Sequence, residues 1–259
     1  MTDPAAPTPP PLDDLGVVVP TIDEAAFLPD LLDDLHTFVP PHRVVVVDGG
    51  SIDDTPRLAA DAGVRVLVTP PSRGGQLNAG AEILGTEWIL FLHADSRVPR
   101  ETRLALRRWL VDPPPCEAAH FHFALRESRW YGPWLRRGQR VREVLTGLAY
   151  GDQGLVISKR RFQEVGGYPE LPVMEDVGII RSLRRSGGVA RIDAPLPTSA
   201  RRYDETGPIR AWLRNASLLA LFQVRVPARH LARLYAPRRH TTPADAPAEA
   251  RPGSERSPS

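Results

Sequence analysis

A carboxylate or an arginine follows each of the first four apolar runs of the chain, in two cases together with glycines. They fall in Pro20–Glu24, Asp48–Thr55, Ser72–Gly80 and His93–Ser96. Carboxylates can bind metal ions or accept protons, arginine pairs with phosphate, and glycine lets the backbone approach a ligand closely. Any one of these segments could be an ordinary turn or helix cap. The four together indicate one ligand site.

The elements that must position these residues alternate between short β-branched runs and helical patterns. The expected strands are 16–20, 44–47, 64–68 and 88–92. The expected helices are the leucine stripe of 28–35, capped by Asp23, a helix that begins at Thr55-Pro56, and 76–84. This rhythm predicts a parallel sheet with right-handed crossovers. In such a sheet, ligands bind beyond the carboxyl ends of the strands, where the polar segments lie.

The second half of the chain is less regular. Ala118–Leu125 alternates like an antiparallel strand, Leu155–Ile157 predicts a short strand, and Met174–Arg185 and Ile209–Tyr235 have helical patterns. We therefore expect an α/β fold in which a mostly parallel central sheet is flanked by helices and followed by a helical C-terminal part.

Both ends of the chain are rich in Pro, Ala and Ser and poor in aliphatic residues. We expect disordered tails at 1–14 and 237–259, and a single folded domain over 15–236.

Composition excludes several classes of protein. The chain has 33 basic and 31 acidic residues, a formal charge of +2, so nothing in its overall charge favours nucleic-acid binding. Cys116 is the only cysteine, which excludes an intramolecular disulfide and fits a reducing compartment. No apolar run approaches the roughly 20 residues of a membrane span, and the N-terminus lacks a secretory pattern. We expect a cytoplasmic protein without a transmembrane segment.

Several strings of residues together carry a family resemblance. They are Val17–Glu24, Val46–Thr55, Arg73 with Asn78–Gly80, Leu92–Asp95, Gly166–Tyr168 and Met174–Asp176. This set resembles the family 2 glycosyltransferases of the GT-A fold, from about Leu15 to Tyr235. The further strings Tyr150–Gly154, Pro172–Val177 and Ser199–Tyr203 are similar to a small bacterial subgroup, labelled arsenosugar-biosynthesis-type or radical-SAM/selenodomain-associated glycosyltransferases.

The resemblance implies transfer of a sugar from a nucleotide diphosphate sugar to an acceptor, with inversion and with help from Mg²⁺ or Mn²⁺. The donor-binding residues that it implies are Pro20, Thr21, Asp23, Glu24, Asp48, Gly49, Gly50, Ser51, Arg73, Asn78, His93, Ala94 and Asp95. His93-Ala94-Asp95 stands where the family has a D-x-D metal motif, and only the last carboxylate is present. Asp95 is therefore the expected metal ligand, through diphosphate oxygens and water.

The same resemblance assigns the catalytic carboxylates. Asp176 would be the general base that takes the proton of the acceptor hydroxyl, with Glu175 in support. Both residues precede a predicted helix, so capping is the structural alternative. Asp152 and Gln153, and Arg201 with Arg202, would contact acceptor or diphosphate, with a plain turn and a solvated pair on a strand edge as their alternatives.

The acceptor can be a small molecule or a lipid. The arginines between 126 and 142 accompany Trp130, Tyr131 and Trp134, and more arginines punctuate 209–235. We expect an exposed helix and loop over the acceptor cleft, and a helix packed on the core. Peripheral contact with the inner face of the membrane stays open for a lipid acceptor.

Other activities are less consistent with the sequence. It lacks the G-x-x-x-x-G-K-[ST] and G-x-G-x-x-G patterns of P-loop kinases and dinucleotide dehydrogenases. A sugar nucleotidyltransferase would need a glycine-rich loop after the first strand, where Pro20–Glu24 stands. A non-catalytic nucleotide-sugar binding protein is the remaining alternative, because the metal motif is reduced.

Overall fold

The computed structural model describes residues 12, 14–146 and 151–235. Seven strands form one sheet in the order β3-β2-β1-β4-β6-β5-β7. Their bounds are β1 Leu15–Thr21, β2 Val44–Asp48, β3 Arg65–Val68, β4 Trp88–Phe91, β5 Ala118–Leu125, β6 Leu155–Ser158 and β7 Ala190–Thr198. Strands β3, β2, β1 and β4 are parallel, β6 is antiparallel to both β4 and β5, and β7 is parallel to β5. The expected α/β class with a mostly parallel sheet is confirmed.

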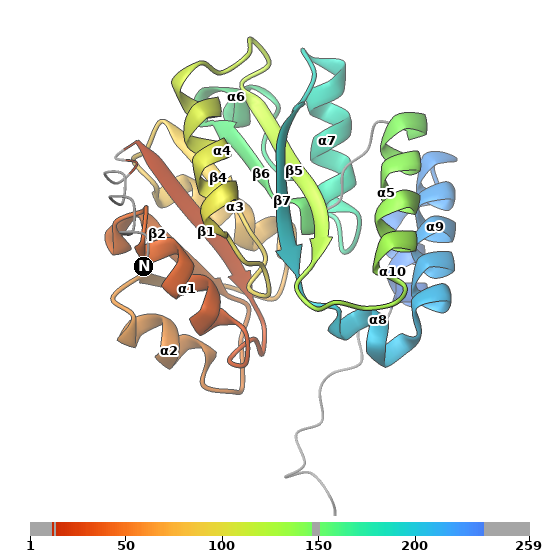
Figure 1. Ribbon diagram of the computed structural model, residues 1–259, viewed down its shortest axis with the longest axis horizontal. Helices are drawn as coiled ribbons and strands as arrows, with labels where there is room; N and C mark the ends of the chain where they lie inside the picture. The colour runs from red at the N-terminus through yellow and green to blue at the C-terminus, as the bar shows by residue number, and fades with distance from the viewer. Residues whose placement is uncertain (1–11, 13, 147–150, 236–259) are drawn as a thin grey trace, which may run out of the picture.

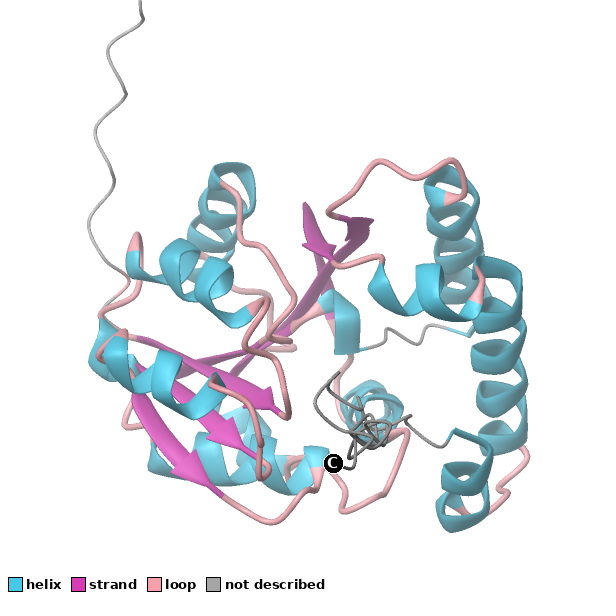
Figure 2. Cartoon of the chain, turned by 90° about the horizontal axis from the view of Figure 1, so that it is seen from below, coloured by secondary structure: helices cyan, strands magenta, loops and turns pink. Residues whose placement is uncertain are grey.

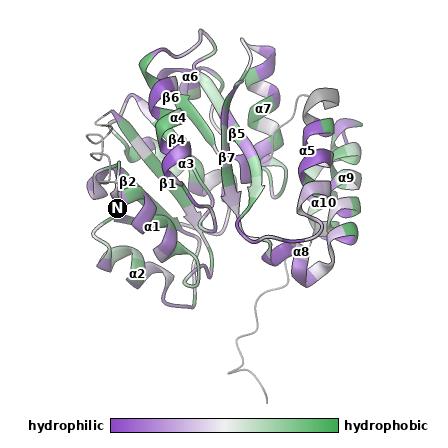
Figure 3. Ribbon diagram, viewed as in Figure 1, coloured by the Kyte–Doolittle hydropathy of each residue, from purple (hydrophilic) through white to green (hydrophobic). Residues whose placement is uncertain are grey.

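Apolar residues on the central strands point alternately to the two faces of the sheet, and helices cover both faces (Figures 1 and 2). Val17 and Val19 pack in one buried cluster and Val18 in the other. The first cluster includes residues of α1 and α4, and the second includes residues of α3, α6 and α7. Burial on both faces explains the continuous apolar runs of the parallel strands, which are green in Figure 3.

The helices have the following bounds. They are α1 Leu28–His36, α2 Thr55–Asp61, α3 Arg73–Ile83, α4 Arg100–Val111, α5 Gly132–Thr146, α6 Lys159–Glu164, α7 Glu175–Arg185, α8 Arg201–Thr206, α9 Pro208–Gln223 and α10 Ala228–Tyr235, with short 3₁₀ turns η1 Pro41–Arg43 and η2 Gly151–Gln153. No helix in the described part of the chain is long and apolar enough to cross a bilayer.

Helices α5 and α9 stand beyond β5 and β7, away from β1 and β2 (Figure 1). Trp134 of α5 and Trp212 of α9 have ring centroids 5.5 Å apart. A small cluster that includes Phe123 of β5 and Tyr203 of α8 connects this group of helices to the sheet. The expected helix at 209–235 is two helices, because the chain turns at Val224–Pro227 between α9 and α10.

One local prediction is wrong, and one structural alternative is excluded. Asp23 does not cap α1, whose N-cap is Phe27 without a side-chain hydrogen bond; the Asp23 carboxylate instead accepts from the Ile52 N–H. Arg201 and Arg202 begin α8, so the alternative of a pair on a strand edge does not hold.

Leu12, which falls within the expected N-terminal tail, packs against the core, and its N–H donates to the Phe38 carbonyl at 2.9 Å. The rest of the expected tails, except Asp14, lies outside the described residues.

Candidate active site

The loops that follow β1 and β2 are held together by hydrogen bonds. The Asp23 N–H donates to Ser51 Oγ at 2.9 Å, and the Ile52 N–H donates back to Asp23 Oδ1 at 2.9 Å. The Glu24 N–H donates to Thr55 Oγ1 at 2.9 Å. Asp23 has a φ of 54°, a left-handed conformation that aspartate adopts more readily than most residues. These contacts place the predicted donor-binding segments side by side at the carboxyl edge of the sheet.

Asp48 organises the second of these loops. Its Oδ2 accepts the N–H groups of Gly50 and Ser51, both at 2.9 Å, and its Oδ1 accepts the hydroxyls of Thr21, at 3.1 Å, and Ser51. The carboxylate is almost fully buried. Gly49 passes so close to Ile22 that a Cβ would lie 2.8 Å from its Cγ1. In this structure Asp48 therefore shapes the loop.

Glu24 and Arg201 bring the first loop to α8. Arg201 Nη2 lies 3.2 Å from both carboxylate oxygens of Glu24, and its guanidinium carbon lies 4.6 Å from the centroid of the Phe27 ring. Burial raises the pKa of Glu24, against the effect of the Arg201 charge. The side chain of Arg202, the next residue, is more exposed than that of Arg201.

Helix α3 is fixed by polar contacts and close packing. Gln76 Nε2 donates to the carbonyls of Thr21 at 3.0 Å and Val47 at 2.7 Å. Asn78 exchanges two hydrogen bonds, both 2.9 Å, with the backbone of Tyr168. A Cβ on Gly80 would lie 2.4 Å from Val18, so glycine lets the helix approach the sheet. Asn78, a predicted donor-binding residue, thus fixes α3 to the Tyr168 turn.

The N-terminus of α3 places Arg73 between two functional candidates. Arg73 Nε lies 3.3 Å from Glu175 Oε1, and an Arg73 Nη2 hydrogen bond reaches His93 Nε2. Burial, with the charges of Arg73 and Arg202, holds the pKa of His93 well below its usual value. The imidazole is therefore neutral at physiological pH. The structure thus brings together Arg73 and His93, which are predicted to bind the donor, and Glu175, which is predicted to support the base.

Asp176 lies at the start of α7 and is fixed by backbone groups. Its Oδ2 accepts the Gly151 N–H at 2.8 Å, and its Oδ1 accepts the Val177 N–H at 2.7 Å. A Cβ on Gly151 would lie 2.7 Å from His93 Nε2, so only glycine allows this approach. Met174, just before α7, has a φ of 67°, which is strained for a residue with a side chain. The chain accepts that strain next to the carboxylate pair.

Burial and mutual repulsion perturb the carboxylates around Asp176. Burial and the charge of Asp176 raise the pKa of Glu175 to about 7, against the effect of Arg73. Burial raises the pKa of Asp152 to about 6, helped by the charges of Asp176 and Asp95. Asp152 Oδ1 is buried without a hydrogen-bond partner in the described part of the chain. Perturbed carboxyl groups at one place are typical of catalytic sites.

Asp95 follows β4 and is almost fully buried. Its Oδ1 accepts the Thr198 hydroxyl at 3.0 Å, which connects it to the end of β7. Ala94, its neighbour, is buried too, and Pro20 lies within β1. Gln153 is fully buried; its Nε2 donates to the Phe121 carbonyl at 3.2 Å, and its Oε1 accepts from Arg142 at 3.2 Å.

The donor set at Asp95 fits a divalent cation that is shared with a substrate. Among the described residues, no group of three or more His, Cys, Asp or Glu could hold a metal by itself. Mg²⁺ keeps several waters and binds to one or two carboxylates together with substrate phosphates. Asp95 supplies one carboxylate. Asp152 adds a buried oxygen that has no hydrogen-bond partner among the described residues, and Asp152 lies close enough to Asp95 for the charge of Asp95 to raise its pKa. The residues fit that mode of binding.

Three contributors were not identified from the sequence. Thr198, Gln76 and Tyr168 contact or position predicted site residues. Burial, together with the charges of Asp176 and Glu175, raises the pKa of Tyr168. Gly166-Gly167-Tyr168 had been noted as a motif without a role, whereas no local pattern marks Thr198, which reaches Asp95 across 103 positions of sequence.

The sheet and its polar carboxyl edge define a GT-A fold. Residues 16–152, just over half of the chain, match the model of glycosyl transferase family 2. The chain belongs to this family.

Solved structures share the fold at low sequence identity. Glucosyl-3-phosphoglycerate synthase from Mycobacterium tuberculosis, in complex with Mn²⁺, UDP-glucose and phosphoglyceric acid, matches with a TM-score of 0.59 and 18% identity, over 83% of this chain and 81% of that chain. The same enzyme in complex with Mg²⁺ and UDP matches with a TM-score of 0.55 and 21% identity, with the same coverage of both chains. S. aureus TarS matches with a TM-score of 0.53 and 14% identity, over 86% of this chain and 42% of that chain. A comparison with curated proteins found no match.

Proposed function

We propose that this family 2 glycosyltransferase moves a sugar from a nucleoside diphosphate sugar to a hydroxyl group of an acceptor, with inversion at the anomeric carbon. The observation that carries the proposal is the meeting of Arg73, His93, Glu175 and Asp176 at the carboxyl edge of the sheet, beside Asp95 and Asp152. The reaction requires a basic group that binds the diphosphate, a carboxylate that binds a cation and a carboxylate that accepts the proton of the acceptor hydroxyl.

Asp176 is the proposed general base. Each of its oxygens accepts one backbone N–H, which fixes the carboxylate and leaves a further lone pair on each oxygen for a proton. Burial and the charge of Asp176 raise the pKa of Glu175 to about 7. The proposed support from Glu175 is to hold Arg73 beside Asp176, through the Arg73 Nε–Glu175 Oε1 contact at 3.3 Å.

The donor is proposed to bind over the loops after β1, β2 and β4. We keep the predicted donor-binding residues of these loops as the proposed donor contacts. Asp48 and Asn78 also act by hydrogen bonds that fix the backbone of the site. Arg73 and Arg202 are the proposed diphosphate contacts. Structural neighbours crystallised with UDP-glucose or UDP make uridine nucleotides the first ligands to test.

Asp95 is the proposed ligand of Mg²⁺ or Mn²⁺, with Asp152 close by. When bound, such an ion neutralises charge that develops on the departing diphosphate. The structural neighbours crystallised with Mn²⁺ or Mg²⁺ support this choice of ions. The arsenosugar- or radical-SAM-associated subgroup also stays a proposal, based on the strings Tyr150–Gly154 and Pro172–Val177.

A thermal-shift screen tests the proposal. Nucleoside diphosphates are added one at a time to the protein with Mn²⁺ or with EDTA, because a ligand that binds only the folded state raises its melting temperature. We expect one diphosphate to stabilise the protein more with Mn²⁺ than with EDTA. Release of nucleotide from the corresponding sugar donor then shows turnover. No stabilisation by any diphosphate would overturn the proposal, and binding without turnover of any donor would favour the non-catalytic alternative.

A further inference from the structure

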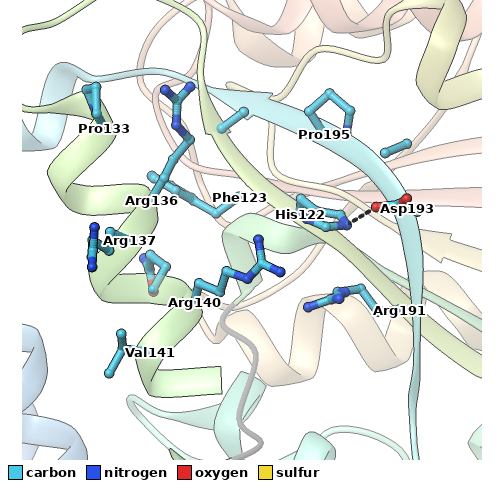
Figure 4. Close-up of a pocket in the computed structure, with 13 residues that line it drawn as sticks. His122, Phe123, Pro133, Arg136, Arg137, Arg140, Val141, Arg191, Asp193 and Pro195 are labelled. Atoms are coloured by element: carbon cyan, nitrogen blue, oxygen red, sulfur yellow. Dashed lines mark ion pairs between the residues drawn. The ribbon is translucent and has the colours of Figure 1, made fainter. Parts of the chain in front are cut away.

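A large pocket lies between α5 and the strands β5 and β7, at the opposite end of the sheet from the predicted nucleotide loops (Figure 4). Its volume is about 920 Å³. We call it the α5 pocket and define it by Arg136, Gln139 and Arg140 of α5, His122 of β5 and Arg191 of β7. Apolar residues of the two strands, among them Phe123 and Ala194, form part of its wall.

The α5 pocket is strongly basic. Arg136, Arg137, Arg140 and Arg191 line it against a single carboxylate, Asp193, whose side chain is exposed and already pairs with His122 at 2.9 Å. Arg140 and Arg191 extend toward each other across the pocket from opposite walls (Figure 4). In the described part of the chain, none of Arg136, Arg137 and Arg140 pairs with a carboxylate. Among the described residues, no carboxylate therefore balances the positive charge of these three arginines.

This arrangement has a cost in the free protein. Arg136 and Arg140 are four residues apart on one helix, where like charges repel each other. Gln139, between them, is 7% exposed, and its Oε1 is buried without a hydrogen-bond partner among the described residues. A bound molecule with an anionic group and a hydroxyl donor would remove both costs, because guanidinium groups bind phosphate or carboxylate through paired hydrogen bonds and a hydroxyl can donate to the amide oxygen.

The pocket is connected to the catalytic carboxylates through α5. Arg142 lies three residues beyond Gln139, on the same side of the helix, and donates to Gln153 Oε1 at 3.2 Å. Gln153 follows Asp152, whose carboxyl group feels the charge of Asp176. These contacts connect the helix that lines the pocket to Asp152 and to the proposed base.

We propose that the α5 pocket binds the acceptor by an anionic group, so that the acceptor is a hydroxylated organic anion such as a phosphate ester. The inference that the bound molecule is the acceptor rests on the proposed function, whereas the inference that the α5 pocket binds an anion does not. The anion can belong to a soluble metabolite or to a lipid headgroup, and the two sources are distinguished by experiment.

Calorimetry with glycerol 3-phosphate as the probe, and glycerol as its neutral match, tests the pocket in the full chain. We expect the wild type to bind the phosphate ester and not glycerol. Arg136→Gln/Arg140→Gln should weaken this binding at least tenfold, the size expected for lost charge-assisted hydrogen bonds. Arg100→Gln/Arg108→Gln on α4 removes the same charge from two exposed positions elsewhere and should change affinity less than twofold. Equal losses in both double variants, or no loss in either, would overturn the proposal.

Sedimentation with vesicles identifies the source of the anion. The anion belongs to a lipid if the protein binds phosphatidylglycerol vesicles but neither phosphatidylcholine vesicles nor glycerol 3-phosphate. This binding must also require Arg136 and Arg140. Binding of neither probe by the wild type overturns the proposal. UDP titrations in parallel separate the two hypotheses, because the pocket variant should bind UDP as the wild type does. If UDP never binds while glycerol 3-phosphate binds through these arginines, the proposed function fails and the anion pocket stands.

Discussion

Replacing Asp152 by asparagine is expected to stabilise the protein at pH 8. Burial raises the pKa of this carboxyl group from 3.8 to about 6, and its Oδ1 has no hydrogen-bond partner in the described residues. A shift of about 2 units corresponds to about 3 kcal/mol of unfavourable free energy once the group is ionised in the folded state. Asparagine has nearly the same shape and carries no charge, so it removes this cost.

The pH dependence of the effect has a definite sign. A raised carboxyl pKa favours the protonated folded state, so the stabilisation is present at low pH and is lost as pH rises through about 6. The advantage of Asp152→Asn should therefore be about 3 kcal/mol at pH 8 and about half of that at pH 5.

Urea denaturation of both proteins in EDTA at these two pH values measures the difference. Asp112→Asn, at an exposed carboxylate that ends α4, is the matched control and should show no such trend. A variant less stable than the wild type at pH 8, or a difference that does not change with pH, would refute the reasoning.

Further predictions concern the donor side and the packing of α3. Asp95→Ala should abolish the difference between UDP affinities measured calorimetrically with Mn²⁺ and with EDTA; a difference that survives would assign the metal elsewhere. Arg73→Ala should weaken UDP binding by about 1.5 to 3 kcal/mol, tenfold or more, and an unchanged dissociation constant in a folded variant would remove Arg73 from the donor site. Gly80→Ala should destabilise the protein by about 1 to 3 kcal/mol in urea denaturation, because the new methyl group would meet Val18; a more stable variant would contradict this packing argument.

The parallel half of the sheet could be predicted because its physics is local. Val17–Val19 and Val44–Val47 are buried on both faces, and a continuous β-branched run is the direct result. Strand β7 was missed because Pro195 and Pro197 argue against a strand. The sheet accepts them because β7 lies at its edge, a fact that only the assembled sheet provides. Helix α4 was not predicted either, although Leu106, Trp109 and Leu110 follow helical spacing and pack in the core.

In the candidate site, too, local features could be predicted from the sequence and contacts between distant segments could not. The glycines and carboxylates after the strands could be predicted to meet at one edge of the sheet, because the carboxyl ends of parallel strands lie there. What individual residues do depends on contacts across the chain. Asp23 was expected to cap a helix and instead bonds to Ile52, and Asp95 finds its partner at Thr198. Such contacts between distant segments have no local sequence signal.

The central claim, that Asp176 is the base of a sugar transfer, is tested most directly by Asp176→Asn. Asparagine can still accept the Gly151 N–H through its side-chain oxygen, so the local structure should persist. The amide has no useful basicity, and a lost general base lowers turnover by roughly 10²- to 10⁴-fold. The measurement is the release of nucleotide from the donor found in the screen, together with donor affinity. The account predicts that release falls by this factor while affinity stays nearly unchanged, and release as fast as in the wild type would contradict it.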